Sequence, residues 1–168
     1  MRAARSGKSS VNRESFMASL DIPFENQLLA FKVCLARRGL QAALAFLNDR
    51  TTYRYTALYT VNHGDFRPLH VFDRCDGHRD DLQSALFLDA LCSITLADGA
   101  FITSDCSQDL RLKPLGGTVV SYCGLVLAPL GGTACGVLCH FDMDHCEVKP
   151  CELAFLRAVT PLLLDHAN

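Results

Sequence analysis

The stretch TVVSYCGLVLAPLGGTACGVLCHFD, residues 118–142, decides the fold of this chain. It contains two apolar runs, 118–127 and 133–142, joined by Pro-Leu-Gly-Gly at 129–132. Proline presets one backbone angle, and glycine adopts a positive φ without steric cost, so this junction predicts a hairpin turn. Neither run carries a charge before Asp142. Such runs are typical of central strands that are covered on both faces.

The composition is that of one globular domain. The chain has 168 residues, of which 49% are apolar and 20% charged, which suffices for one core and does not indicate a second domain. A net charge of −2 produces no broad field that would attract nucleic acid or a membrane surface, so we expect neither as a partner. Residues 1–20 are polar and basic, without an apolar block. They predict a flexible tail and no secretory signal, leaving 21–168 as a single cytoplasmic domain.

The chain contains nine cysteines. An odd number at this density does not indicate a disulfide scaffold. In a reducing compartment we expect most of them to be small buried hydrophobic side chains.

Helical periodicity predicts helices at both ends of the chain and one in the middle. Near the N-terminus, one helix stops at Gly39, and a second ends at Asn48-Asp49. The middle helix covers 80–96, and the last begins at Pro150 with a kink at Pro161. The two terminal apolar stripes are Phe24, Leu28, Phe31 and Leu35, and Leu153, Leu156, Val159 and Leu163.

Alternating periodicity predicts the remaining strands. Residues 52–61 place their tyrosines on one face, and a turn leads into a second strand over 68–73. A short strand covers 100–104, followed by a polar crossover over 105–115 that contains about one helical turn. Together with the opening hairpin, these elements predict an α+β domain. Its mostly antiparallel sheet of about five to six strands has the terminal helices on one face and the middle helix and loops over the other.

Several motifs resemble bacterial GAF domains, a family of small sensory modules. SYCGLVL at 121–127 and GVLCHFD at 136–142 are similar to the last sheet hairpin of the family. YRYT at 53–56 and LHVFDR at 69–74 are similar to its first hairpin, and ADGAFITSD at 97–105 to its third strand. The resemblance covers most of the chain and implies a GAF-like fold, which is profilin-like and related to PAS domains.

The resemblance also implies a place for a ligand. In this family small molecules bind over the sheet face that lies under the middle helix and the crossover loop. A one-residue slip in a strand inverts which side chains face that space, so each candidate could instead be an ordinary core or surface residue. The candidates combine apolar walls with polar tips. They are Tyr59, His70, Phe72, Phe101, Tyr122, Cys123 and Cys139.

The sequence identifies no metal and no cofactor. CHFDMDHC at 139–146 is rich in metal-ligand residue types, but the adjacent strand residues Cys139 and His140 should point to opposite faces, which disfavours four convergent ligands. Bilin-binding GAF domains attach their chromophore through a cysteine beside a histidine, on the segment before the strand that begins near Thr118 here. This segment contains Cys106 but no histidine, which disfavours a covalent bilin.

Three functions follow from the resemblance. The first is a stand-alone, non-catalytic, small-molecule-binding module in signal transduction, which passes occupancy to an unidentified partner in trans. The alternative is a redox enzyme of the free methionine-R-sulfoxide reductase type, which needs an activated cysteine and a resolving one. Cys92, Cys106 and Cys123 lie in the relevant half, but their spacing differs from that branch, and Asp105 should raise the pKa of Cys106. The third is a ligand-free interaction domain.

The terminal helices of GAF domains often pair into homodimers. The two apolar stripes near the chain ends could serve that purpose here, or they could equally pack within one chain. The sequence identifies neither the ligand nor the output partner.

Overall fold

The protein structure, a computed structural model, describes residues 22–75 and 85–167. The predicted tail over 1–20, the loop from 76 and the start of the predicted middle helix over 80–84 lie outside the described residues. Within the described residues, no helix is long and apolar enough to cross a membrane.

One antiparallel sheet organises the chain, with the strand order β2-β1-β5-β4-β3. Its strands are β1 (Tyr55–Asn62), β2 (Asp65–Asp73), β3 (Ala100–Thr103), β4 (Ser121–Leu127) and β5 (Gly136–Asp142). The tyrosine-rich and cysteine-rich hairpins share this sheet because β1 pairs antiparallel with β5. The predicted α+β class and mostly antiparallel sheet are therefore confirmed, with five strands.

The predicted turn between β4 and β5 is also confirmed. The Gly132 N–H donates to the Pro129 carbonyl over 2.9 Å, and Gly131 adopts a φ of 68°, where glycine avoids the steric cost of a side chain. The two strands pair from Ser121 opposite Asp142 to Leu127 opposite Gly136. Every residue of β5 is buried, as expected for the central strand of a sheet that is covered on both faces.

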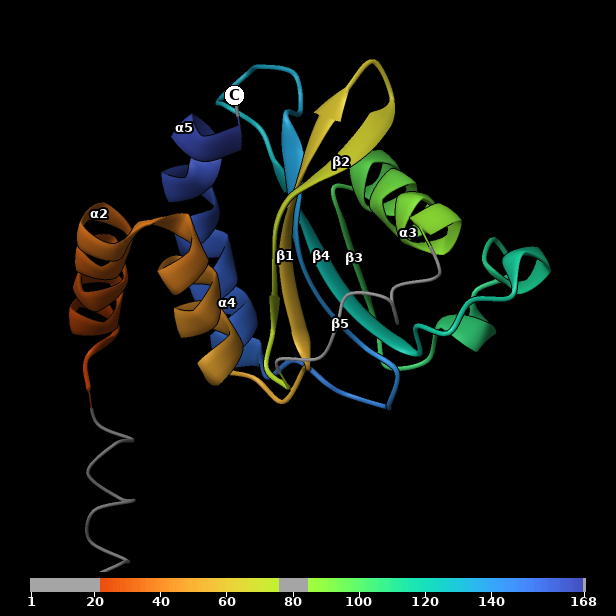
Figure 1. Cartoon of the computed structure of the whole chain (residues 1–168), viewed down its shortest axis with the longest axis horizontal. Helices are drawn as coiled ribbons and strands as arrows, with labels where there is room; N and C mark the ends of the chain where they lie inside the picture. The colour runs from red at the N-terminus through yellow and green to blue at the C-terminus, as the bar shows by residue number, and fades with distance from the viewer. Residues whose placement is uncertain (1–21, 76–84, 168) are drawn as a thin grey trace, which may run out of the picture.

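The terminal helices cover one face of the sheet (Figure 1). Helix α2 (Phe24–Asp49) consists of two helical segments that meet at Gly39, whose φ of 81° and ψ of −177° interrupt the helix where the sequence predicts it. Helix α4 (Pro150–Val159) continues into a 3-10 turn, η4 (Thr160–Leu163), and a short helix α5 (Leu164–Ala167). This break is the one predicted from Pro161, which has no N–H to continue the helical ladder.

The predicted apolar stripes of the terminal helices pack within the chain. Phe31, Leu156 and Val159 are buried in the core between these helices and the sheet. The Phe24 ring, at the start of α2, contacts the Phe155 ring edge-on, with their centroids 5.8 Å apart. These contacts correspond to intramolecular packing, which is one of the two roles that the sequence left open for the stripes.

The other face of the sheet is covered by α3 (Ala85–Asp98) and by the crossover between β3 and β4 (Figure 1). The crossover contains two short 3-10 turns, η2 (Cys106–Gln108) and η3 (Lys113–Leu115), instead of the single predicted turn. Pro114, within η3, presets the backbone angle of such a turn.

Candidate functional site

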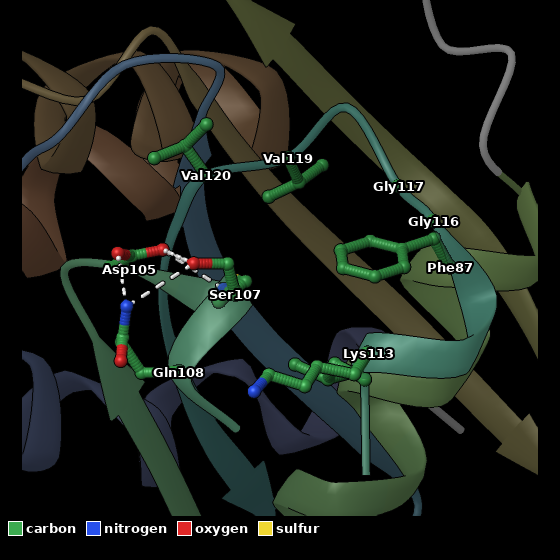
Figure 2. Close-up of a pocket in the computed structure, with 11 residues that line it drawn as sticks. Phe87, Asp105, Ser107, Gln108, Lys113, Gly116, Gly117, Val119 and Val120 are labelled. Carbon is green, nitrogen blue, oxygen red and sulfur yellow. Dashed lines mark hydrogen bonds between the residues drawn. The ribbon is translucent and has the colours of Figure 1, made fainter. Parts of the chain in front are cut away.

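A cavity of about 460 Å³ lies between α3 and the crossover (Figure 2). This volume falls within the range of small-molecule sites, which are mostly apolar and carry a few polar groups. The lining residues are Phe87, Asp105, Cys106, Ser107, Gln108, Leu112, Lys113, Gly116, Gly117, Val119 and Val120.

One wall of the cavity is apolar and closely packed. Phe87 of α3 is buried in the same core as Leu112 and Val119, between α3 and the sheet. The Phe87 ring lies directly against the backbone of Gly117, where an added Cβ atom would lie 2.2 Å from the ring. Only glycine fits at this position while Phe87 keeps its place, so Gly117 and Phe87 together define the shape of this wall.

The other wall is polar and internally hydrogen-bonded. The Asp105 carboxylate accepts hydrogen bonds from the Ser107 N–H over 2.9 Å and from the Ser107 hydroxyl over 2.6 Å. It also accepts one from the Gln108 amide over 3.1 Å (Figure 2). These bonds lower the pKa of Asp105, because they stabilise the charged form. The carboxylate is therefore ionised at neutral pH and holds the first turn of the crossover in place.

Backbone hydrogen bonds connect the crossover to the sheet. The Cys106 N–H donates to the Val120 carbonyl over 2.7 Å, and the Val120 N–H donates to the Asp142 carbonyl at the end of β5 over 2.8 Å. The His145 side chain lies 2.8 Å from the Ser104 carbonyl. The cavity wall is thus held by the central strand rather than by the crossover alone.

Cys106 is one of the residues that line the cavity, but its thiol is not activated. Its pKa is raised to about 12, first by burial and then by the charges of Asp105 and Asp109. The effect of Asp105 is the one predicted from the sequence. Burial likewise raises the pKa of Cys92 and of Cys123 to about 12. Since the thiolate is the nucleophile, all three cysteines are in the unreactive form at neutral pH.

The structure separates the seven predicted site residues into two layers. Tyr59, Phe101, Tyr122 and Cys139 lie on the α3 face. Cys123 and Phe72 instead pack against the terminal helices, and His70 lies 3.1 Å from the Gln41 side chain of α2. The prediction that all seven share one face is therefore wrong for these three. The reason is strand alternation: Cys123 follows Tyr122 directly, and His70 pairs with Leu58, whose side chain faces α2.

The four residues on the α3 face form a packed layer and are not among those that line the cavity. The fully buried Tyr122 side chain lies with its hydroxyl 3.0 Å from the Thr95 hydroxyl and 3.9 Å from the Cys92 sulfur. It crosses over Gly124, where a Cβ atom would lie 2.4 Å from the Tyr122 oxygen. Side chains therefore fill the space over the middle of the sheet, and the cavity lies towards the crossover. A ligand role for these four residues stays a prediction.

Apart from Cys106, which was considered as a redox cysteine, the lining residues were not predicted as site residues, because they belong to α3 and to the crossover that leads into β4. One signal is present in the sequence, the Gly116-Gly117 pair, since adjacent glycines are typical of a turn. Sequence spacing does not reveal that this turn folds back onto Phe87 from α3, because the contact depends on how the crossover packs.

A buried polar network lies on the opposite face of the sheet. The Asn48 amide donates to the Thr56 hydroxyl over 2.9 Å, and this hydroxyl lies 2.7 Å from Nδ1 of His140. His140 is fully buried, and its Nε2 atom has no hydrogen-bond partner among the described residues. Burial, with the charge of Arg74, lowers the pKa of His140 to about 4. Cys139 and His140 point to opposite faces, as predicted.

Within residues 22–75 and 85–167, no group of three or more histidine, cysteine or acidic side chains is placed to hold a metal ion.

Comparisons with known proteins identify the fold. No family model matches the chain, and no curated protein matches it. Among solved structures, the GAF domain of an Acinetobacter phosphoenolpyruvate-protein phosphotransferase superposes with a TM-score of 0.69 at 10% identity, covering 86% of this chain and 92% of that one. This chain has a GAF-like fold.

Enzymes share this GAF-like fold. Free methionine-R-sulfoxide reductase from Neisseria meningitidis, in complex with its substrate, has a TM-score of 0.65 at 15% identity and covers 99% of this chain and 96% of that one. The type II enzyme from Thermoplasma acidophilum has a TM-score of 0.62 at 17% identity, with coverages of 82% and 94%. Because the same fold supports both classes, function must be argued from the residues of the site.

Proposed function

We propose that this GAF-like protein is a non-catalytic sensory or regulatory module of signal transduction, which binds a small molecule in the cavity between α3 and the crossover and acts in the cytoplasm. The observation that carries this proposal is the cavity itself, which combines a buried apolar wall of Phe87, Leu112 and Val119 with a polar wall around Asp105. Such a combination favours a compact ligand with an apolar body and a polar end.

The state of the cysteines supports a non-catalytic role. Cys106 is the cysteine among the lining residues, and its pKa of about 12 leaves it protonated. A cysteine nucleophile instead requires a lowered pKa, which a nearby cation or a helix N-terminus can provide. Its charged neighbours here, Asp105 and Asp109, act in the opposite direction.

Native mass spectrometry of the freshly purified full chain tests this proposal. Ser107 lines the cavity with an exposed side chain, so Ser107→Trp should fill the cavity without overpacking the core. We expect a bound compound of fixed mass with the wild type and its loss with Ser107→Trp. The control variant Leu110→Trp, which changes an exposed residue outside the lining, should keep the compound. An equal amount of compound in Ser107→Trp would contradict binding at this cavity.

A second candidate function is the reduction of free methionine sulfoxide. Two observations favour it: Cys106 lines the cavity, and reductases of this activity are among the structural neighbours. Cys123 is a poor resolving partner for Cys106, because the two lie in cores on opposite faces of the sheet.

An activity assay separates the two functions. Purified protein would be incubated with free methionine-R-sulfoxide and a thiol reductant, and methionine would be quantified. We expect no turnover above a protein-free blank. Turnover that disappears in Cys106→Ser and persists in the opposite-face control Cys123→Ser would establish the enzyme and overturn the sensory proposal.

A third candidate is a ligand-free interaction domain. The packed layer formed by Tyr122, Thr95 and Cys92 beneath α3 favours it, because these side chains fill the middle of the sheet face. It would be supported if neither a co-purified compound nor turnover were found.

We also propose that the output passes through the terminal helices to a second copy of the chain. Apolar side chains remain exposed on the first segment of α2 and just before it, at Ile22, Leu29 and Val33. A homodimer would use this surface instead of the predicted stripes, since those stripes are largely buried in the core.

A further inference from the structure

We propose that the cavity binds a small organic anion, whose negative group is held by Lys113 and by the backbone N–H groups of Gly116 and Gly117, with its apolar part against Phe87. This inference rests on the proposed function, because it requires the cavity to be a ligand site. It goes further by assigning the chemical class of the ligand and the groups that recognise it.

Lys113 provides an uncompensated positive charge at the cavity. Its side chain extends along the cavity towards Gln108 (Figure 2). Among the described residues, salt bridges are formed by Arg50, Arg54 and Arg111, whereas Lys113 forms none. Lys113 is exposed, so its ammonium group attracts an anion with a strength that depends on the salt concentration.

The backbone that follows Lys113 presents further donors. Leu115 ends the right-handed turn η3, and Gly116 is left-handed, with a φ of 57° and a ψ of 70°. A right-handed residue followed by a left-handed one brings successive N–H groups together into a concavity that binds anions. The Leu115 N–H already donates to the Leu112 carbonyl over 3.0 Å. The N–H groups of Gly116 and Gly117 have no acceptor among the described residues.

The negative charge on the opposite wall is already engaged. Asp105 accepts three hydrogen bonds from Ser107 and Gln108, and it forms no salt bridge with Lys113. The neighbouring Arg111 is paired with Asp98 and with Asp109. The lining therefore carries one ammonium group and one carboxylate; among the described residues the carboxylate already accepts three hydrogen bonds, whereas the Lys113 ammonium and the N–H groups of Gly116 and Gly117 have no acceptor. This balance favours an anionic ligand over a cationic one.

Three probes with the same six-carbon chain separate these possibilities. Hexanoate, hexanol and hexylammonium would be titrated into the ¹⁵N-labelled full chain at fixed salt and followed by backbone amide shifts. We expect hexanoate to bind at least about tenfold more tightly than the other two, with the largest shifts at Gly116 and Gly117. Equal affinity for hexanol, or a preference for hexylammonium, would overturn the inference.

Variants of Lys113 test the assigned cation. Lys113→Met should weaken hexanoate binding at least about tenfold and leave hexanol binding unchanged, and Lys113→Arg should restore the carboxylate preference. Lys149→Met removes an exposed lysine that is not among the lining residues and should change nothing. Unaltered hexanoate affinity in Lys113→Met would refute the role of this residue.

These experiments distinguish an incorrect anion site from an incorrect ligand site. Hexanol that binds in the cavity as well as hexanoate would overturn the anion site and leave the ligand site intact. If none of the three probes shifts the amide signals of the cavity, the anion site is overturned. Mass spectrometry of the wild type and Ser107→Trp decides separately whether the cavity binds any ligand.

Discussion

Acid should destabilise this protein through the buried side chain of His140. The Asn48 amide donates to the Thr56 oxygen, and the same hydroxyl lies 2.7 Å from Nδ1 of His140. The imidazole is fully buried, and burial away from water favours its neutral form. Protonation would place a charge there, close to the cationic Arg74, which also lowers the pKa.

The expected size of the effect follows from the difference between two pKa values. Folding lowers the pKa of His140 from 6.5 to about 4, and each pKa unit corresponds to about 1.4 kcal/mol. Between these pH values the unfolded chain binds a proton that the folded chain does not, so the free energy of unfolding falls as the pH falls. The loss should reach about 3 kcal/mol on going from pH 6.5 to pH 4, out of a typical total of about 5–15 kcal/mol.

Urea denaturation at pH 7.0, 5.5 and 4.5 measures this loss. His140→Gln keeps a polar group that can form a hydrogen bond with Thr56 but cannot be protonated, so its stability should fall less steeply with acid than that of the wild type. His166→Gln, which replaces an exposed histidine near the C-terminus, should follow the wild type. Identical pH slopes for the wild type and His140→Gln would refute the reasoning. A direct NMR titration showing the His140 imidazole protonated near pH 6.5 would do so as well, even if His140→Gln folded poorly.

Three further predictions concern packing and assembly. Gly124→Ala should lower the free energy of unfolding by about 1–3 kcal/mol, because its Cβ would overlap the Tyr122 hydroxyl; unchanged urea stability would contradict this contact. Asn48→Ala should lower the free energy of unfolding by about 1–3 kcal/mol. The Asn48 amide donates to the buried Tyr53 carbonyl over 3.0 Å, and the substitution removes this donor. Thermal denaturation measures the loss. Leu29→Lys combined with Val33→Lys should convert the proposed dimer into a monomer by light scattering, and a wild type that is already monomeric would exclude that dimer.

Much of the architecture was predictable because local periodicity reports local geometry. The change from a period of 3.6 to a period of 2 near residue 52 separated the helices from the first hairpin. Gly39 and Pro161 marked the breaks in the terminal helices through their own backbone limits. Each of these inferences concerns residues that are close together in the chain.

The candidate site was less predictable because it depends on contacts between distant segments. Tyr122 and Cys123 were both predicted as candidates for one pocket, although alternation places neighbouring strand residues on opposite faces. The sequence could not say which of the two faces α3, since a strand can present either side to a given layer. The cavity itself requires Phe87 to meet Gly117, which belongs to a different element.

The amino-acid sequence by itself determined the elements of this protein, their order and the antiparallel hairpins, because turn chemistry and side-chain periodicity act over a few residues. Only the tertiary structure decided that the space over the middle of the sheet is filled by Tyr122 and its neighbours, that the cavity lies beside Lys113 and that His140 is fully buried. The physical reason is that cavities, burial and pKa values depend on how distant segments pack together, which no local pattern of residues records.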